Sequence, residues 1–431
     1  MGNPLPRLTL KEYEPGFLEG VALSKGDLQL AEALGGEDGR LIVEDLKKGI
    51  RVSATSWVGI VRFSRFEVRV VPKLAGENLG LVGMLAFTTG IDALNRNKGL
   101  RDLDTLAHTN LFDLLALLFA ESCEKIVNGG LLYDYLMEEQ DLPILRGRLL
   151  VKEQMRRRMG QVDRIECRFD EHSSNIAENK VLTIALSFCA RRVQNPSVLR
   201  KIRRLMQIFL ESCSIQETEI DDLLTNITYN RLNQHYKEPI ELAKILLQAS
   251  GVNDLFSAGA TKSFAFLLDM NKLFELFVYR FIERALDTTG CHVRYQHRDR
   301  SIIWNADANR PYAWVIPDLI IEYPDSSEKR MVIDTKYKLY DLKKVSPADI
   351  YQCFLYAYAY SSNTGSIPKS LILYPTLDIS PNSTNLHVRT KELVVGAKVL
   401  AQGFNIPTAL EEIQLDQSGA MSSLIKAQIF G

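Results

Sequence analysis

Apolar and polar residues follow two different spacings along this chain of 431 residues. In residues 1–100 the apolar residues form short runs typical of strands, the clearest at 41–43, 51–53 and 68–71. Between residues 101 and 260 they recur every three or four positions, which predicts helices over 106–127, 176–193, 199–213 and 240–249. The pattern therefore predicts a strand-rich N-terminal domain, 1–100, followed by a mainly helical middle region, 101–260.

Helix ends and a linker divide the chain further. Gly129-Gly130 ends the first predicted helix, and Glu238-Pro239 breaks the chain before the last. The stretch 250–263 is rich in Gly, Ser and Ala and predicts a linker near residue 260. Residues 261–431 form the third region, with a helix over 270–286, strands, a β-hairpin, a second helix and strands at 371–374 and 393–395. That order suits a core with a mixed sheet, so we predict an α/β and α+β multidomain protein.

The predicted hairpin places two carboxylates opposite each other. Residues 313–321 and 331–333 are mostly apolar, and the Pro, Asp and Ser residues between them favour a connection of several residues. Asp318 and Asp334 are symmetric about Ser326, so they would be cross-strand partners with Cβ atoms roughly 4.5–5.5 Å apart. Lys336 would lie on the same face as Asp334, because side chains alternate along a strand.

This arrangement predicts a magnesium site that hydrolyses a phosphodiester. Two carboxylates in direct opposition destabilise a sheet, and a bound cation removes that cost. Mg²⁺ prefers oxygen ligands, usually one or two carboxylates with waters and substrate phosphate. Lys336 would orient or deprotonate the attacking water and offset charge that develops on the phosphate. The alternative is an ordinary exposed hairpin with scattered charges.

Asp318 followed by Asp334-x-Lys336 resembles the PD-(D/E)xK nuclease motif. After the hairpin, Ser346-Pro347 predicts a helix start, with Ser as N-cap and Pro at the first helical position. Gln352 and Tyr356 lie four positions apart on that helix and resemble the Q-x-x-x-Y element of RecB-like members. A half-buried helix face would show the same spacing.

The resemblance also implies an acidic residue on the first helix of a nuclease core, near the metal. Glu275, in the predicted helix over 270–286, is the first candidate and Glu283 is the second. A surface glutamate on an amphipathic helix is the alternative. The catalytic residues implied are thus Asp318, Asp334, Lys336, Glu275 and Gln352.

Most of the chain resembles McrC-like proteins. The stretches that carry this resemblance are VGIVRFSRFEVRVVPKL at 58–74, LRGRL at 145–149, NIAENK at 175–180 and MNKLFE at 270–275. The resemblance runs from about residue 58 to 360. It implies that residues 261–431 form a nuclease domain and that the N-terminal half docks with a ring-forming AAA+ GTPase. It also implies a substrate, DNA bearing modified cytosine (5-methylcytosine). McrC-like subunits also occur in restriction systems that recognise a defined unmodified sequence.

Charge does not by itself indicate a DNA-binding protein. Lys and Arg number 52 against 53 Asp and Glu, whereas a freestanding DNA binder usually has a basic excess. The most basic stretch is 146–168, which can neutralise phosphates, face an acidic partner surface or form a solvated loop. Candidate nucleic-acid contacts are Arg146, Arg148, Arg156, Arg157, Arg158 and Tyr356.

Other features of the sequence restrict the function. The six cysteines are scattered without a C-x-x-C pair, so they favour neither a disulfide framework nor a zinc site. We found no signal-peptide layout and no apolar run of about 18 residues, so we expect a cytoplasmic protein without a membrane segment. The P-loop pattern is absent, so another subunit would hydrolyse the nucleotide. Two other functions remain open: a non-catalytic adaptor that stimulates the partner GTPase, and a RecB-like exonuclease.

Overall fold

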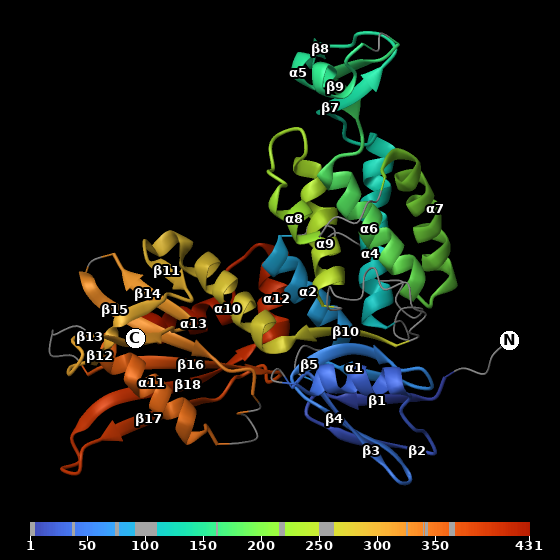
Figure 1. The fold of residues 1–431 in the computed structure, drawn as a ribbon. Coiled ribbons are helices and arrows are strands. Elements are labelled where there is room, and N and C mark those ends of the chain that lie inside the picture. The colour runs from blue at the N-terminus through green and yellow to red at the C-terminus, as the bar shows by residue number, and fades with distance from the viewer. Residues whose placement is uncertain are drawn as a thin grey trace. The chain divides into compact units, whose positions relative to one another are not determined.

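The computed structural model describes most of the chain in helices, strands and their connections (Figure 1). The described residues are 5–36, 39–73, 77–90, 110–160, 163–214, 220–249, 263–324, 326–338, 340, 344–361 and 367–431. The predicted linker, 250–263, lies outside them except for Ser263. The chain divides into two compact units, Gly99–Gly259 and the remainder, Met1–Lys98 with Ala260–Gly431. Both units contain helices and strands, so the mixed α/β class is confirmed.

The N-terminal part of the larger unit is built from two sheets. The four-stranded sheet has the order β1 (Arg7–Lys11), β6 (Glu67–Val71), β5 (Trp57–Arg62), β10 (Phe264–Asp269). The three-stranded sheet has the order β2 (Pro15–Glu19), β4 (Gly49–Ala54), β3 (Leu41–Leu46), and α1 (Lys25–Gly35) contacts β3. The predicted strands at 41–43, 51–53 and 68–71 are therefore confirmed. Phe63 and Phe66 are fully buried and stacked on each other, so they are core residues.

Strand β10 brings the two ends of the larger unit together and was not predicted. It begins directly after residues 250–262 and pairs antiparallel with β5, so Phe266 lies opposite Ile60. Gly59 makes the close approach possible, because its φ is +147° and a Cβ there would lie 2.0 Å from the carbonyl oxygen of Phe266. The helix that follows, α10 (Met270–Leu286), thus starts at the edge of the N-terminal sheet.

The C-terminal part is a six-stranded mixed sheet covered by helices on both faces. Its order is β11 (His292–Tyr295), β14 (Leu319–Tyr323), β15 (Ser326–Thr335), β16 (Lys369–Thr376), β18 (Val395–Asn405), β17 (Ser383–Arg389). Helix α11 (Pro347–Ala359) packs Cys353 against Val399 and Ala401 on one face of β18. Helix α10 packs Phe277 and Phe281 against Phe404, which alternation places on the other face.

Further helices and a separate hairpin complete this unit. They are α2 (Glu77–Thr89), α12 (Ile406–Leu415), α13 (Ala420–Phe430), and the two-stranded sheet of β12 (Asp299–Asn305) with β13 (Arg310–Val315). The predicted strand at 393–395 begins only at Val395, because Leu393 has φ +63° and belongs to a turn. The hairpin connection is tighter than predicted, since β14 ends at Tyr323 and β15 begins at Ser326.

The smaller unit is helical with an additional small sheet. Its helices are α4 (Leu111–Gly129), α6 (Ala177–Arg192), α7 (Pro196–Ser212), α8 (Ile220–Thr225) and α9 (Lys237–Gln248). The start of the predicted helix 106–127 lies outside the described residues up to 109. Helix α9 does not break at Pro239, because proline is tolerated in the first turn of a helix.

The additional sheet of the smaller unit occupies the basic stretch and its neighbours. It has the order β7 (Asp134–Leu142), β9 (Ile165–Ser173), β8 (Arg148–Leu149), with the short helix α5 (Val151–Arg157) between β8 and β9. The solvated-loop interpretation of 146–168 is therefore wrong for most of that stretch. In the part of the chain that is described, none of the helices is long and apolar enough to span a membrane.

Candidate active site

The β14–β15 hairpin has the register that the sequence predicts next to the two carboxylates. Leu319 pairs with Ile333 and Ile320 with Val332, and these pairs place Asp318 across from Asp334. A bulge beyond Glu322 shortens the far end of the hairpin and leaves this register unchanged. Asp318 lies directly before β14, and its Oδ2 accepts hydrogen bonds from the main-chain N (2.7 Å) and Oγ1 (2.8 Å) of Thr335.

Asp334 is a buried carboxylate that lacks hydrogen-bond donors. Its side chain is 1% exposed, and neither carboxylate oxygen accepts a hydrogen bond from the residues that the structure describes. Lys336 Nζ lies 2.9 Å from Asp334 Oδ2 and forms an ion pair with it. Burial raises the pKa of Asp334 to about 7, and the charge of Asp318 acts in the same direction. The ammonium of Lys336 offsets part of the cost of burying this carboxylate.

Lys336 remains charged in this environment. Burial alone would lower the pKa of its amine, but the carboxylates of Asp334 and Asp318 outweigh burial and raise the pKa above its ordinary value. A protonated amine can hold negative charge or orient a water, whereas it cannot accept a proton.

Glu275 faces this group of residues from α10. Burial and the charge of Asp318 raise the pKa of Glu275, so the two carboxylates interact. Gln296 Nε2 donates a 2.7 Å hydrogen bond to Glu275 Oε1. The second candidate, Glu283, is exposed and bonds to Tyr279 and Arg280 of its own helix. Gln296 follows β11 and was missed, because only the pairing of β11 with β14 brings it here.

Helix α11 begins as the sequence predicts. Ser346 is the N-cap and accepts from the main-chain N of Asp349, and proline occupies the first helical positions. Gln352 Nε2 donates a 2.8 Å hydrogen bond to the Tyr356 hydroxyl, which donates to the Ile316 carbonyl at 3.3 Å. Tyr356 is only 6% exposed, and its contact with nucleic acid stays a prediction. It holds the segment that leads to Asp318.

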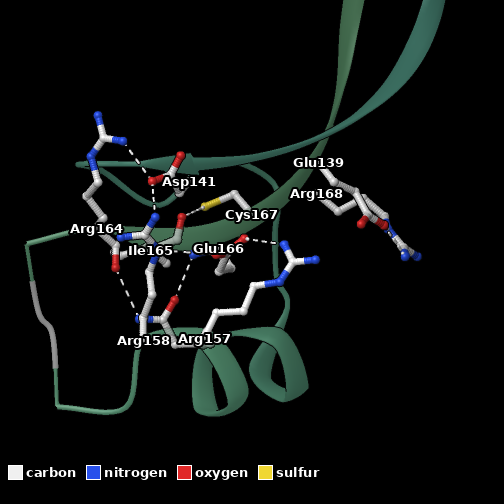
Figure 2. Close-up of polar contacts among 10 residues, drawn as sticks. Glu139, Asp141, Arg157, Arg158, Arg164, Ile165, Glu166, Cys167 and Arg168 are labelled. Carbon is white, nitrogen blue, oxygen red and sulfur yellow. Dashed lines mark hydrogen bonds and ion pairs between the residues drawn. The ribbon is translucent and has the colours of Figure 1, made fainter.

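The predicted basic patch is largely paired with carboxylates of its own sheet (Figure 2). Arg158 forms ion pairs with Asp141 and with Glu166, the latter at 3.2 Å. Arg157 forms a second ion pair with Glu166, at 3.7 Å. Arg146 lies 2.5 Å from Glu171 Oε2. Within the described ranges, no ion pair is found for Arg148 or Arg156. Much of the positive charge is thus neutralised locally, and these five arginines remain predicted contacts only.

The two opposed carboxylates are a donor set that would suit a magnesium ion. Among the described residues, no group of three or more His, Cys, Asp and Glu side chains is arranged to hold a metal. Asp318 and Asp334 offer two carboxylates across the hairpin, with Lys336 beside Asp334. Mg²⁺ commonly binds through one or two carboxylates and completes its shell with water and phosphate.

Comparison with known proteins connects this geometry to a family. The model of a family described as "McrBC 5-methylcytosine restriction system component" matches residues 52–375, more than half of the chain. The chain is 22% identical over 297 residues to the type IV methyl-directed restriction enzyme EcoKMcrBC of Escherichia coli (strain K12), covering 64% of this chain and 80% of that protein.

Solved structures share the fold. A chain in a half-complex from the tetradecameric assembly of Thermococcus gammatolerans McrB AAA+ hexamers with bound McrC matches with a TM-score of 0.64 and 19% identity. The match covers 95% of this chain and 98% of that chain. A chain in the Thermococcus gammatolerans McrBC complex matches over 65% of this chain and 88% of that chain, with 22% identity and a TM-score of 0.47. The protein described here belongs to the family of McrBC 5-methylcytosine restriction system components.

Proposed function

We propose that this chain is the Mg²⁺-dependent endonuclease subunit of a McrBC-type, modification-dependent restriction system, with a nuclease core of the PD-(D/E)xK type. One observation carries the proposal. Asp334 is buried with two oxygens that accept no hydrogen bond from the described residues, and it lies beside Asp318 and Lys336. A buried carboxylate that shares its lysine with a second carboxylate is expensive, and a functional ligand site is a common reason for keeping one.

Each residue of the site has a distinct role in this proposal. Asp318 and Asp334 would hold the ion, which when bound polarises the phosphate and activates water. Lys336 holds a positive charge where negative charge grows on the phosphate. Glu275 adds a third carboxylate near Asp318, positioned by Gln296. Gln352 and Tyr356 fix the main chain two residues before Asp318.

The proposed partners come from the family. One solved relative contains McrB AAA+ hexamers with bound McrC, and the curated relative is methyl-directed. We propose that this chain likewise works with an AAA+ GTPase ring and cleaves DNA containing 5-methylcytosine. A ring partner also accounts for the net charge of −1, because DNA capture would not rest on this chain alone.

The test is cleavage of closed-circular DNA, cytosine-methylated or unmethylated, with Mg²⁺. Wild type and Asp334→Ala are each assayed with and without the partner GTPase and GTP. We expect linearisation of methylated circles that needs the partner and disappears in the variant. Cutting by a homogeneous Asp334→Ala preparation would remove the site assignment. Because a circle has no end, its cleavage also separates an endonuclease from a RecB-like exonuclease.

Two other functions give different results in the same assay. A sequence-specific restriction subunit would cut unmethylated circles that contain its target sequence. A non-catalytic adaptor would stimulate the partner GTPase without cutting under any condition. The local neutralisation of Arg146, Arg157 and Arg158 suits an adaptor, whereas the donor-poor carboxylate of Asp334 favours catalysis.

A further inference from the structure

The β12–β13 hairpin exposes three large aromatic side chains near the candidate active site. Trp304 is 51% exposed, Tyr312 is 73% exposed and Trp314 is 47% exposed. Val315 is buried among Tyr356, Tyr360 and Ile320, so the inner face of β13 packs on the core. Because side chains alternate along a strand, Tyr312 and Trp314 occupy the outer face. Exposed aromatic groups of this kind commonly mark binding surfaces.

Exposed arginines accompany these rings. Arg298, Arg300 and Arg310 are exposed, and none of them forms an ion pair within the described parts of the chain. The guanidinium of Arg300 lies over Trp314, 4.2 Å from the ring centroid. The nearby carboxylate of Asp299 accepts from Ser301 and does not neutralise them. The arginines of the β7–β9 sheet, by contrast, are mostly paired (Figure 2).

The hairpin is continuous with the proposed metal ligands. Strand β13 ends at Val315, and Ile316 and Pro317 lead directly to Asp318. Trp314 and Asp318 are four positions apart, which limits the distance between their Cα atoms to about 14 Å. The bond from Tyr356 to the Ile316 carbonyl fixes this connection. A polymer bound at Asp318 can therefore reach the outer face of the hairpin within a few monomers.

We propose that the β12–β13 hairpin is a DNA-contacting surface of this protein, an inference that rests on the proposed nuclease function. Arg298, Arg300 and Arg310 neutralise backbone phosphates, and the rings of Tyr312 and Trp314 stack on bases or sugars. The unpaired positive charge complements DNA, and Arg300 pre-positions the Trp314 ring. Stacking on bases requires an unstacked or single strand, so the hairpin favours single-stranded DNA over intact duplex.

The experiment measures binding of the full chain to fluorescent single-stranded and duplex oligonucleotides, with EDTA present so that nothing is cleaved. Trp314→Ala and Tyr312→Ala are each expected to raise the Kd for single strands about tenfold, the typical loss of one stacking contact. Arg300→Ala should reduce the slope of log K against log salt by about 1. Trp314→Phe should keep most of the affinity, because a ring remains.

Matched controls lie on the N-terminal three-stranded sheet of the same unit. Phe17 of β2 is 48% exposed, a fraction similar to the 47% of Trp314. Arg51 of β4 is also exposed. Phe17→Ala and Arg51→Ala should leave the Kd and the salt slope unchanged. Wild-type affinity in Trp314→Ala and Tyr312→Ala would overturn the proposal, as would equal losses in the controls. Normal DNA binding with lost association to the GTPase ring would also overturn it and assign the face to a protein.

The outcome separates this inference from the nuclease proposal. Asp334→Ala should bind DNA normally and fail to cleave it. If wild type never cleaves while the hairpin variants lose DNA binding, the nuclease proposal fails and the DNA surface stands. If Asp334→Ala abolishes cleavage while the hairpin variants bind and cleave like wild type, the DNA surface fails and the nuclease stands.

Discussion

The hydroxyl of Tyr337 donates a 3.1 Å hydrogen bond to Oε2 of Glu12, which joins the N-terminal region to the residue after Lys336. Tyr13 adds a second link, because its hydroxyl donates to the Tyr337 carbonyl at 3.2 Å. The Tyr337 ring also packs on Phe274 of α10, with centroids 5.7 Å apart. The N-terminal region and α10 together fix the segment that carries Lys336.

Replacing Tyr337 by Phe should therefore weaken both stability and cleavage. Glu12 is fully buried, and removing one of its donors should cost about 1–3 kcal/mol of unfolding free energy. Displacement of Lys336 should lower the cleavage rate and leave the DNA affinity unchanged. Chemical denaturation and kinetics measure these two effects.

Tyr323→Phe is the matched control for that substitution. Tyr323 is also a tyrosine of this unit with a hydroxyl bond, 2.6 Å to the Ile429 carbonyl, and it lies at the far end of the hairpin. It should lose comparable stability and keep its cleavage rate. Equal rates in the two variants would show that Tyr337 does not position Lys336.

Magnesium binding should depend on pH through Asp334. The folded pKa of Asp334, about 7, is above the ordinary value near 3.9, so the native state retains a proton that the unfolded state releases. Without metal, this group makes stability fall as pH rises from about 4 to 7. Mg²⁺ needs the ionised form, so its effect on Tm should be larger at pH 8 than at pH 6.

Asp334→Asn tests whether this residue is responsible. The variant should lose the dependence of the Mg²⁺ effect on pH, because the amide neither ionises nor binds the cation strongly. The measurement is the Tm of each protein with and without about 10 mM Mg²⁺. A magnesium effect that persists unchanged in Asp334→Asn would place the ion at other residues.

Asp27 should stabilise the N-terminal region at neutral pH and lose that effect in acid. Its carboxylate accepts hydrogen bonds from Ser263 Oγ (2.7 Å) and the main-chain N of Ser64 (2.8 Å). Burial would raise the pKa of Asp27, but these donors and Ser24 outweigh burial and hold the pKa below its usual range. A depressed folded pKa contributes stability above the unfolded pKa that is lost as pH falls below about 4.

Asp27→Asn should therefore cost about 2 kcal/mol at pH 7, the scale of a lost cap with buried donors. The difference from wild type should shrink in denaturation experiments at pH 3. Asp45→Asn, at an exposed position of β3, should change the unfolding free energy little at either pH. If Asp27→Asn lowers the unfolding free energy by the same amount at pH 7 and pH 3, the charge of Asp27 does not stabilise the N-terminal region.

The basic stretch of the smaller unit yields a test of its structural role. Arg158→Ala removes a partner of the buried Glu166 and should cost about 1–3 kcal/mol locally, seen as faster hydrogen exchange along β9. The described residues contain no ion-pair partner for Arg156, so Arg156→Ala should leave hydrogen exchange along β9 unchanged. If Arg156→Ala accelerates exchange as much as Arg158→Ala, the ion pairs do not explain the stability of this sheet.

The sequence by itself determined the features that depend on neighbouring residues. The register of β14 with β15 beside the carboxylates was predictable from a hairpin symmetric about Ser326, whereas the bulge beyond Glu322 and the tight connection were not. The start of α11 at Ser346-Pro347 was predictable for the same reason, because capping is local chemistry.

Tertiary structure decided what depends on pairing between distant segments. Strand β10 looks apolar in the sequence, but only its pairing with β5 shows that it closes the N-terminal sheet. The arginines of 146–168 look like a phosphate-binding patch until β7 supplies Asp141 as a partner. Tyr356 looks available at helical spacing until packing against Val315 buries it. Spacing along a chain fixes which face a side chain occupies, whereas its charge balance and exposure depend on which remote segments cover that face.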